Sequence, residues 1–227
     1  MDSFRAVQTH KASIPSTGRT PQFLAKQYGY DSAKQFADAI PESAIVIDVG
    51  AGVSRLGHYV ARWRPDVKWV NADLAYANPA VLEEASRSVP KNLKFVCGDV
   101  IAFSPELHAY QGKAHRVYSY WMMPHLSLSN VMLAEKAAGT MWELLNAQGQ
   151  LAIGPIRSGW WYYKHSLQFS KRTPKAEVAR VVARATKLHW LPRKVQALGN
   201  KYNVHVGNHI LAAIHWWQAR RSSDRAE

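Results

Sequence analysis

The stretch Ala44-Ile-Val-Ile-Asp-Val-Gly-Ala-Gly-Val-Ser54 decides the fold of this 227-residue chain. It is continuously apolar up to Asp48, which is typical of a parallel strand that is buried on both faces of a sheet. The turn that follows contains Gly50 and Gly52, and glycine lets a backbone turn tightly and approach a ligand closely. In open α/β sheets, the turn at the carboxyl end of the first strand is where nucleosides bind. We therefore expect a ligand site at this turn.

Strands and helices alternate on both sides of this stretch. Downstream of it, Leu56, Tyr59, Val60 and Trp63 fall at helical spacing. The sequence predicts further strands at 67–72, 93–97, 116–120 and 151–153, helices at 32–40, 79–88 and 131–145 and from 174 onward, and a turn at Gly149. Such alternation implies right-handed crossovers and a doubly wound, mostly parallel α/β sheet. The β-rich runs 202–206 and 210–217 predict an antiparallel hairpin that closes this sheet.

The length and composition define the class of protein. A chain of 227 residues with 47% hydrophobic and 11% aromatic residues fits one packed domain and excludes disorder throughout. We expect residues 1–40 to form a lead-in with lid helices. Residues 41–227 should form one domain, with a ligand-binding half at 41–155 and a basic, aromatic-rich part at 156–227. One cysteine excludes a disulfide framework, and the absence of a signal peptide and of a long apolar run predicts a cytoplasmic protein.

The positive charge of the chain is concentrated in its last third. Residues 1–150 hold 15 basic and 13 acidic side chains, whereas residues 151–227 hold 14 basic and 3 acidic ones, within a total net charge of +13. Such asymmetry is typical of proteins that bind nucleic acid, an anionic membrane surface or a phosphorylated ligand. A solvated surface that keeps the protein soluble is the alternative interpretation.

Two acidic residues follow the glycine turn at the ends of the next two strands. The dinucleotide fingerprint would need glycine at Arg55, so a pyrophosphate-binding turn is not indicated. Asp73 lies 21 residues beyond Gly52, where a carboxylate can accept hydrogen bonds from both hydroxyls of a ribose. Asp99 ends the third strand, where an acceptor can meet an exocyclic amine. The pattern therefore favours a nucleoside-containing ligand.

The motifs VIDVGAG, NADLAYA, FVCGDV, VYSYWMMPHL and LLNAQGQLAIG together resemble the class I S-adenosylmethionine (SAM) methyltransferases over residues 40–155. The resemblance implies a seven-stranded sheet that ends in an antiparallel hairpin. It also implies SAM as cofactor and S-adenosylhomocysteine as product. The chain departs from the family at Ser54, where a third glycine is common, and at Arg116, where the fourth motif often has an acid.

The resemblance also implies which residues bind the cofactor. Asp48, Gly50 and Gly52 would line the methionine portion, Asp73 would bind the ribose diol, and Asp99 with Val100 would frame the adenine. The remaining residues implied at this site are Ala51, Ser54, Leu74 and Ser119.

In methyl transfer from SAM, the sulfonium already makes the methyl group electrophilic. The protein must therefore mainly hold a nucleophile in line with that methyl group. Tyr118, Tyr120, Trp121 and His125 follow the fourth strand, near the expected position of the methyl group. His125 is the best candidate base because its ordinary pKa is close to neutral. The alternatives are a loop histidine without a catalytic role and tyrosines that form the pocket wall or the core.

Two other residue types carry no predicted chemistry. His205 and His209 are four residues apart, but the Gly-Asn pair between them argues against a helix, so we predict no metal site. Cys97 falls in a predicted buried strand and is expected to be an inert core residue.

The methyl acceptor has three candidate classes. A small molecule is favoured by the aromatic segment 160–169, which could roof a pocket or instead be a buried connection. RNA or a nucleotide is the alternative, because aromatic and basic residues alternate in the basic part. Anionic phospholipid headgroups form the third class. The sequence assigns no oligomeric state.

Overall fold

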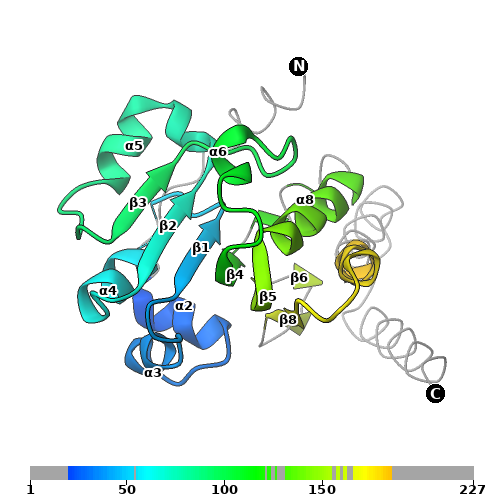
Figure 1. Ribbon diagram of the computed structural model, residues 1–227, viewed down its shortest axis with the longest axis horizontal. Coiled ribbons are helices and arrows are strands. Elements are labelled where there is room, and N and C mark those ends of the chain that lie inside the picture. Colours follow the sequence, from blue (N-terminus) through cyan, green and yellow to red (C-terminus); the bar gives the residue numbers. More distant parts are fainter. Residues whose placement is uncertain are drawn as a thin grey trace, which may run out of the picture.

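The computed structural model describes residues 20–185, except residues 54, 121, 124–125, 127–130, 155–156, 159–160 and 163–165. Six strands form one sheet in the order β3-β2-β1-β4-β5-β8 (Figure 1). They are β1 (Ile45–Val49), β2 (Lys68–Ala72), β3 (Leu93–Val96), β4 (Ala114–Tyr120), β5 (Leu145–Gly154) and β8 (Leu167–Ser170). The first five are parallel and β8 is antiparallel to β5. This arrangement confirms the predicted α/β class with a mostly parallel sheet.

The antiparallel edge of the sheet comes from an unexpected part of the chain. β8 lies within the region that was predicted to be an aromatic roof or a buried connection, and it follows a small hairpin of β6 (Arg157–Ser158) and β7 (Trp161–Tyr162). The described sheet therefore has six strands where the resemblance implied seven. The predicted hairpin at 202–217 lies outside the described residues.

β5 begins earlier than the sequence predicts. It starts at Leu145, directly after the long helix, so Gly149 lies inside the strand and the prediction of a turn there is wrong. The reason is a shift in register with β4: Ala114 pairs with Leu145, but Arg116 pairs with Gln150. The periodicity of one strand does not show how it pairs with its neighbour, so this irregularity in pairing is not predicted from the sequence.

The described helices are α2 (Pro21–Gln27), α3 (Ala33–Asp38), α4 (Leu56–Trp63), the 3-10 helix η1 (Leu74–Ala77), α5 (Pro79–Ala85), α6 (Pro105–His108) and α8 (Val131–Leu144). Side-chain caps begin four of these helical segments, α2, α3, η1 and α5. Asn78 is the N-cap of α5 and its side chain accepts a hydrogen bond from the Ala80 N–H, while Pro79 is the first helical residue. This confirms the predicted cap of α5. That helix ends at Ala85, three residues before the predicted end. Residues 175–185 are also helical, as expected after Pro174.

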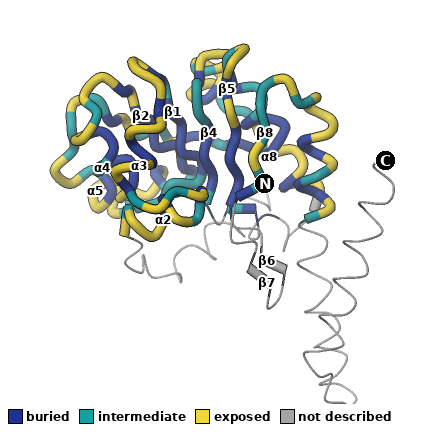
Figure 2. The backbone as a smooth tube through the Cα atoms, turned by 90° about the horizontal axis from the view of Figure 1, so that it is seen from below, coloured by how far each residue is buried: buried dark blue, intermediate teal, exposed yellow. Residues whose placement is uncertain are grey.

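Buried strands separate two apolar clusters, one on each face of the sheet (Figure 2). On one face, α2, α3 and α4 contribute Leu24, Phe36 and Val60, which pack against the fully buried Trp69 of β2. On the other face, α8 and helical residues 175–185 pack against the sheet. Their buried contributions are Ala134, Ala138, Met141, Val178 and Val182. α2 and α3, within the predicted lead-in at residues 1–40, bury side chains in the core of the domain, and their predicted role as lid helices stays a prediction.

At Gly57, α4 packs closely against β2 of the sheet. A Cβ at this position would lie 2.5 Å from Nε1 of Trp69, which is held at 2.8 Å from Oδ1 of Asn71. We expect Gly57→Ala to lower the free energy of unfolding by about 2 kcal/mol, because overpacking outweighs the helix propensity gained. Chemical denaturation measures the change.

The matched control for this prediction is Gly139→Ala in α8. Its added Cβ would meet only Cε of Lys175 at 3.2 Å, which is the flexible end of a side chain. This variant should be as stable as the parent or up to about 1 kcal/mol more stable. Equal stabilities of the two variants would contradict the packing argument.

Candidate functional site

The turn after β1 has the backbone geometry that its glycines permit. Gly50 has φ of +75° and Gly52 has φ of +53°, a region that favours glycine. The Gly50 N–H donates to the Ala72 carbonyl at 2.8 Å, so the turn stays attached to the end of β2. A Cβ on Gly50 would come within 3.0 Å of the Met122 side chain. Both the conformation and the packing therefore require glycine at this position.

Asp73 holds the glycine turn in place from the end of β2. One carboxylate oxygen, Oδ2, accepts a hydrogen bond from the Gly52 N–H at 2.8 Å. The other, Oδ1, accepts from the Ala75 N–H at 2.8 Å and caps η1, which begins at Leu74. Asp73 is only 2% exposed. Asp73 thus holds the glycine turn by a direct hydrogen bond, and its predicted role as a ribose acceptor stays a prediction.

Tyr76 is a third member of this group, and the sequence analysis missed it. Its hydroxyl donates to the Gly52 carbonyl at 2.6 Å, so Gly52 is held through both its N–H and its C=O. Burial, and then the nearby Asp73 carboxylate, raise the pKa of Tyr76 well above its usual range, so the hydroxyl keeps its proton. The sequence signal was that Tyr76 follows Asp73 by three positions. The turn of η1 between them brings the Tyr76 hydroxyl to Gly52, after β1.

Asp48 is a buried carboxylate without a hydrogen-bonding partner for its side chain among the described residues. It is 4% exposed, and burial together with the Asp73 charge raises its pKa to about 8. The strand register places it between Asn71 of β2 and Tyr118 of β4. The Asn71 Nδ2 atom is also buried and has no hydrogen-bond partner in the described structure. Buried polar groups in this state are typical of binding sites rather than of structural cores.

The loop after β3 contains the third predicted acid. The Asp99 Oδ1 atom accepts hydrogen bonds from Ile101 N–H at 2.7 Å and Ala102 N–H at 3.0 Å, and Val100 is buried beneath it. Asp99 therefore shapes its own loop and makes no described contact with the Asp73 group. Cys97 is exposed because β3 ends at Val96, so the prediction of a buried core cysteine is wrong.

The end of β4 carries the predicted Ser119, Tyr118 and Tyr120. Ser119 is 1% exposed, and its hydroxyl oxygen has no hydrogen-bond partner in the described structure. Tyr118 is buried in an aromatic cluster, with its ring centroid 4.8 Å from that of Tyr28 and 5.0 Å from that of Phe36. Tyr120 is half-buried at the end of the strand, with its ring edge-on to Phe23 and Tyr28. Tyr28, which the sequence analysis did not select, thus joins α2 to the site.

Ala51 is half-buried within the glycine turn, and its predicted contact with the cofactor stays a prediction. Ser54, Trp121, His125, His205 and His209 lie outside the described residues. Among the residues that are described, no three His, Cys, Asp or Glu side chains gather in an arrangement that could hold a metal ion. Nor does any helix in this part of the chain have the length and apolarity needed to cross a membrane.

The arrangement fits a ligand that carries a ribose and a positive charge. Each carboxylate oxygen offers more than one lone-pair site, so Asp73 can accept from ribose hydroxyls while it holds the two backbone N–H groups. The unpartnered Asp48 carboxylate offers an acceptor and, when ionised, a counter-charge to a cation. The partnerless Ser119 hydroxyl and Asn71 amide supply further polar atoms at this edge of the sheet.

No protein-family model matches the chain, and no curated protein sequence matches it. Among solved structures, it is similar to a TehB-like SAM-dependent methyltransferase from Corynebacterium glutamicum, with 19% identity, coverage of 80% of this chain and 83% of that one, and a TM-score of 0.47.

Two further solved structures match smaller parts of the chain. The antibiotic-resistance methyltransferase Kmr has 22% identity over 64% of this chain and 77% of that one, with a TM-score of 0.42. The 16S rRNA (adenine(1408)-N(1))-methyltransferase from Catenulisporales acidiphilia, solved with the cosubstrate SAM, has 18% identity over 48% of this chain and a TM-score of 0.38. The match spans 55% of that rRNA enzyme, little more than half of its length.

Proposed function

We propose that this chain is a SAM-dependent methyltransferase that acts on a small-molecule acceptor. The observation that carries the proposal is the group formed by Gly52, Asp73 and Tyr76, in which the glycine turn is fixed on both sides by hydrogen bonds of 2.8 and 2.6 Å. This group lies at the carboxyl edge of the parallel strands, where open α/β sheets bind nucleoside ligands. The Asp48 carboxyl beside it favours a cationic ligand when it is ionised.

Each residue of the group has a defined task in this proposal. The cofactor, when bound, supplies an electrophilic methyl group on a sulfonium. Asp73 accepts hydrogen bonds from the ribose hydroxyls, and Asp99 with Val100 borders the base. Asp48 opposes the positive charge of the amino acid portion. The protein's contribution is orientation, because rigid placement of the two reactants replaces the entropy cost of their encounter.

The acceptor side of the site lies at the end of β4. Tyr120 is half-buried there, and the aromatic rings of Phe23 and Tyr28 stand beside it. We infer that these rings line the entry of the acceptor, since aromatic walls suit both an apolar acceptor and a cationic sulfonium. His125 remains our candidate for the base, needed only when the acceptor carries a proton at the working pH.

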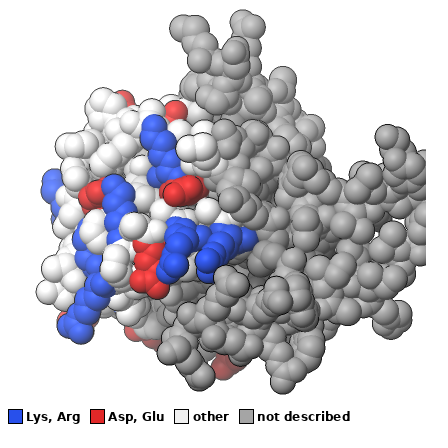
Figure 3. All heavy atoms as spheres, turned by 90° about the vertical axis from the view of Figure 1, so that its right-hand side faces the viewer, with Lys and Arg blue, Asp and Glu red and all other residues white. Residues whose placement is uncertain are grey.

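Two described lysines, Lys171 and Lys175, are already paired within the protein, which supports a small acceptor over RNA. Lys175 forms a 2.6 Å ion pair with Glu143, and Lys171 lies 3.3 Å from the centroid of the Trp142 ring while its ammonium donates to the Trp142 carbonyl. On the face shown in Figure 3, Lys and Arg side chains alternate with Asp and Glu. Cations that are already paired within the protein contribute less to phosphate binding.

RNA is the second candidate acceptor, favoured by one feature of helical residues 175–185. Arg180 and Arg184 are both exposed on the side of this helix opposite the buried Val178 and Val182. They belong to the basic region 151–227, which has 14 basic and 3 acidic residues. An RNA acceptor would require affinity that falls steeply with salt concentration.

The decisive experiment has two parts. SAM or S-adenosylhomocysteine at 100 times its dissociation constant should stabilise the protein by about 2.7 kcal/mol, seen as a rise in melting temperature, whereas ATP, which lacks the cationic amino acid, should not. Labelled methyl transfer from SAM into metabolite, RNA and lipid fractions then identifies the acceptor class. We expect label in the metabolite fraction. Absence of any thermal shift would contradict the cofactor, and label in RNA or lipid would contradict the acceptor.

A further inference from the structure

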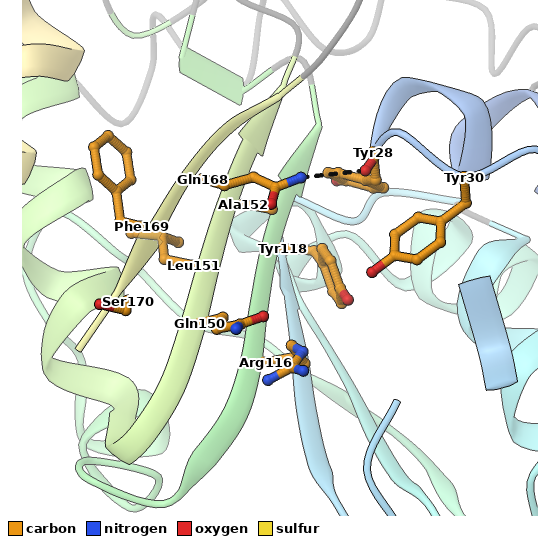
Figure 4. Close-up of a pocket in the computed structure, with 10 residues that line it drawn as sticks. All are labelled: Tyr28, Tyr30, Arg116, Tyr118, Gln150, Leu151, Ala152, Gln168, Phe169 and Ser170. Carbon is orange, nitrogen blue, oxygen red and sulfur yellow. Dashed lines mark hydrogen bonds between the residues drawn. The ribbon is translucent and has the colours of Figure 1, made fainter. Parts of the chain in front are cut away.

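A solvent-open hollow of about 190 Å³ lies over β4, β5 and β8, away from the carboxyl edge of the sheet (Figure 4). Its lining includes Arg116 on β4 and Gln150 on β5, with Tyr118, Tyr28 and Tyr30 around them. Ligand pockets for drug-sized molecules measure roughly 300–1,000 Å³, so this hollow suits a smaller ligand.

The hollow exists because helices cover the two faces of the sheet unequally. Tyr118 and Ala152 belong to the apolar cluster on the face that carries α2, α3 and α4. Arg116 and Gln150 lie two residues before them on the same strands, and therefore on the same face. The helix at 175–185 follows β8 but buries Val178 and Val182 on the opposite face. Within the described part of the chain, no helix covers the last three strands around Arg116.

Arg116 is a half-buried cation in the middle of the sheet, and no carboxylate in the described part of the chain pairs with it. Its Nη1 donates a hydrogen bond to the carbonyl of the neighbouring His115 at 3.0 Å, and its guanidinium also hydrogen-bonds the side chain of Tyr118. A guanidinium has five N–H donors in a planar fork that matches a carboxylate. Most of these donors remain available, in a place where removal from bulk water makes an anionic partner favourable.

Neighbouring polar groups converge on the same point. Gln150 is directly opposite Arg116 in the strand register, and Figure 4 shows its amide pointing to the side of the guanidinium. The Tyr118 hydroxyl is turned toward Arg116 in the same view. Burial raises the pKa of Tyr118 well above its ordinary value, so its hydroxyl keeps the proton that it can donate to an anion. Three donor groups therefore surround one small volume.

Aromatic rings form the upper wall of the hollow. The rings of Tyr28 and Tyr118 are 4.8 Å apart, and Tyr30 points its hydroxyl into the same space (Figure 4). The Gln168 amide donates to the Tyr28 carbonyl at 3.4 Å, which ties β8 to the segment after α2. Rings at this position favour a flat, apolar ligand body through offset or edge-to-face packing.

We propose that this hollow is a binding site for a small aromatic carboxylate, with the carboxylate on Arg116 and Gln150 and the ring against Tyr118 and Tyr30. The site is separate from the proposed cofactor site and does not depend on it. Arg116 lies four residues before the end of β4, which corresponds to roughly 13 Å along the strand. A ligand of this size on Arg116 therefore does not reach the glycine turn.

Benzoate is the probe, titrated into the full chain by calorimetry, with benzyl alcohol as the uncharged analogue and inorganic phosphate as the anion without a ring. We expect saturable binding of benzoate and at least tenfold weaker binding of both analogues. Arg116→Gln should weaken benzoate binding at least tenfold, because the amide cannot form the paired, charge-assisted hydrogen bonds that a guanidinium makes with a carboxylate. Arg184→Gln, which removes an exposed arginine elsewhere, should leave it unchanged.

A second variant keeps the test independent of folding. Gln150 is exposed, and Gln150→Glu places a carboxylate opposite Arg116 that competes with the ligand without disturbing the core. Benzoate binding should be lost in this variant while its thermal unfolding in the absence of ligand stays that of the parent. If Arg116→Gln or Gln150→Glu bound benzoate as tightly as the parent, the proposal would be overturned. Displacement of benzoate by saturating S-adenosylhomocysteine would also overturn it, because the two sites would then be one.

Discussion

Replacement of Asp73 with alanine is expected to weaken SAM binding at least 100-fold and to abolish the thermal shift produced by S-adenosylhomocysteine. The substitution removes the proposed ribose acceptor and also the two hydrogen bonds that hold the Gly52 and Ala75 N–H groups. A hydrogen bond to a charged group contributes about 1.5–3 kcal/mol, so the loss of two such bonds accounts for this range. Calorimetric titration of parent and variant measures it.

The control for this prediction is a second carboxylate that also holds a backbone N–H group. Asp66 accepts a hydrogen bond from the Ser43 N–H at 3.0 Å and pairs with Arg64, at the amino-terminal end of the strands. Asp66→Ala should leave SAM affinity within about twofold of the parent, because no ligand is expected there. If Asp73→Ala bound SAM as tightly as Asp66→Ala, the ribose assignment would be wrong.

Substitution of Asp48 by asparagine is expected to stabilise the protein at alkaline pH by roughly 3 kcal/mol. The folded pKa of about 8 lies far above the ordinary value near 4, because the carboxylate is buried and close to Asp73. Between these two values the folded state binds the proton more tightly than the unfolded state. The parent's free energy of unfolding should therefore fall as pH rises from about 4 to about 8, and then change no further at this site.

Urea unfolding of both proteins at pH 4.5, 7 and 9 tests this expectation. Asp48→Asn should lack the descending limb, so the difference between the two proteins grows with pH and is largest at pH 9. Parallel pH dependences for the two proteins would contradict a raised pKa at Asp48. The same variant should bind SAM more weakly, since the amide offers no counter-charge to a cation.

The parts of the site that the sequence predicted are those encoded locally. The apolar run before Asp48 marks a buried strand, and the spacing of Gly50, Gly52 and Asp73 follows from the length of one strand–helix–strand unit. Such features depend only on neighbours along the chain. The structure confirms the strands that carry these residues, and it adds the direct hydrogen bond between Gly52 and Asp73, which the sequence did not predict.

The features that the sequence did not predict depend on distant contacts. Tyr28 reaches Tyr118 from α2, 90 residues earlier in the chain, and no periodicity indicates that pairing. The shift in pairing between β4 and β5 just before Gln150 depends on how the two strands align, which neither strand's own sequence determines. Cys97 falls just past the last paired residue of β3, and element boundaries depend on the partner strand as much as on the local sequence. Tertiary context decides each of these.

The central position of β1 in the sheet has a consequence for the order of folding. β1 pairs with β2 across a short interval, Ile45 with Lys68, but its other neighbour β4 comes 70 positions later, Val46 with Arg116. Closing the longer loop costs about 1 kcal/mol more in chain entropy. A chain emerging from the ribosome keeps this edge of its most apolar strand unpaired until residue 120 is synthesised, and unpaired apolar edges promote aggregation. The open edge of β1 therefore stays a potential aggregation site during synthesis until β4 pairs with it.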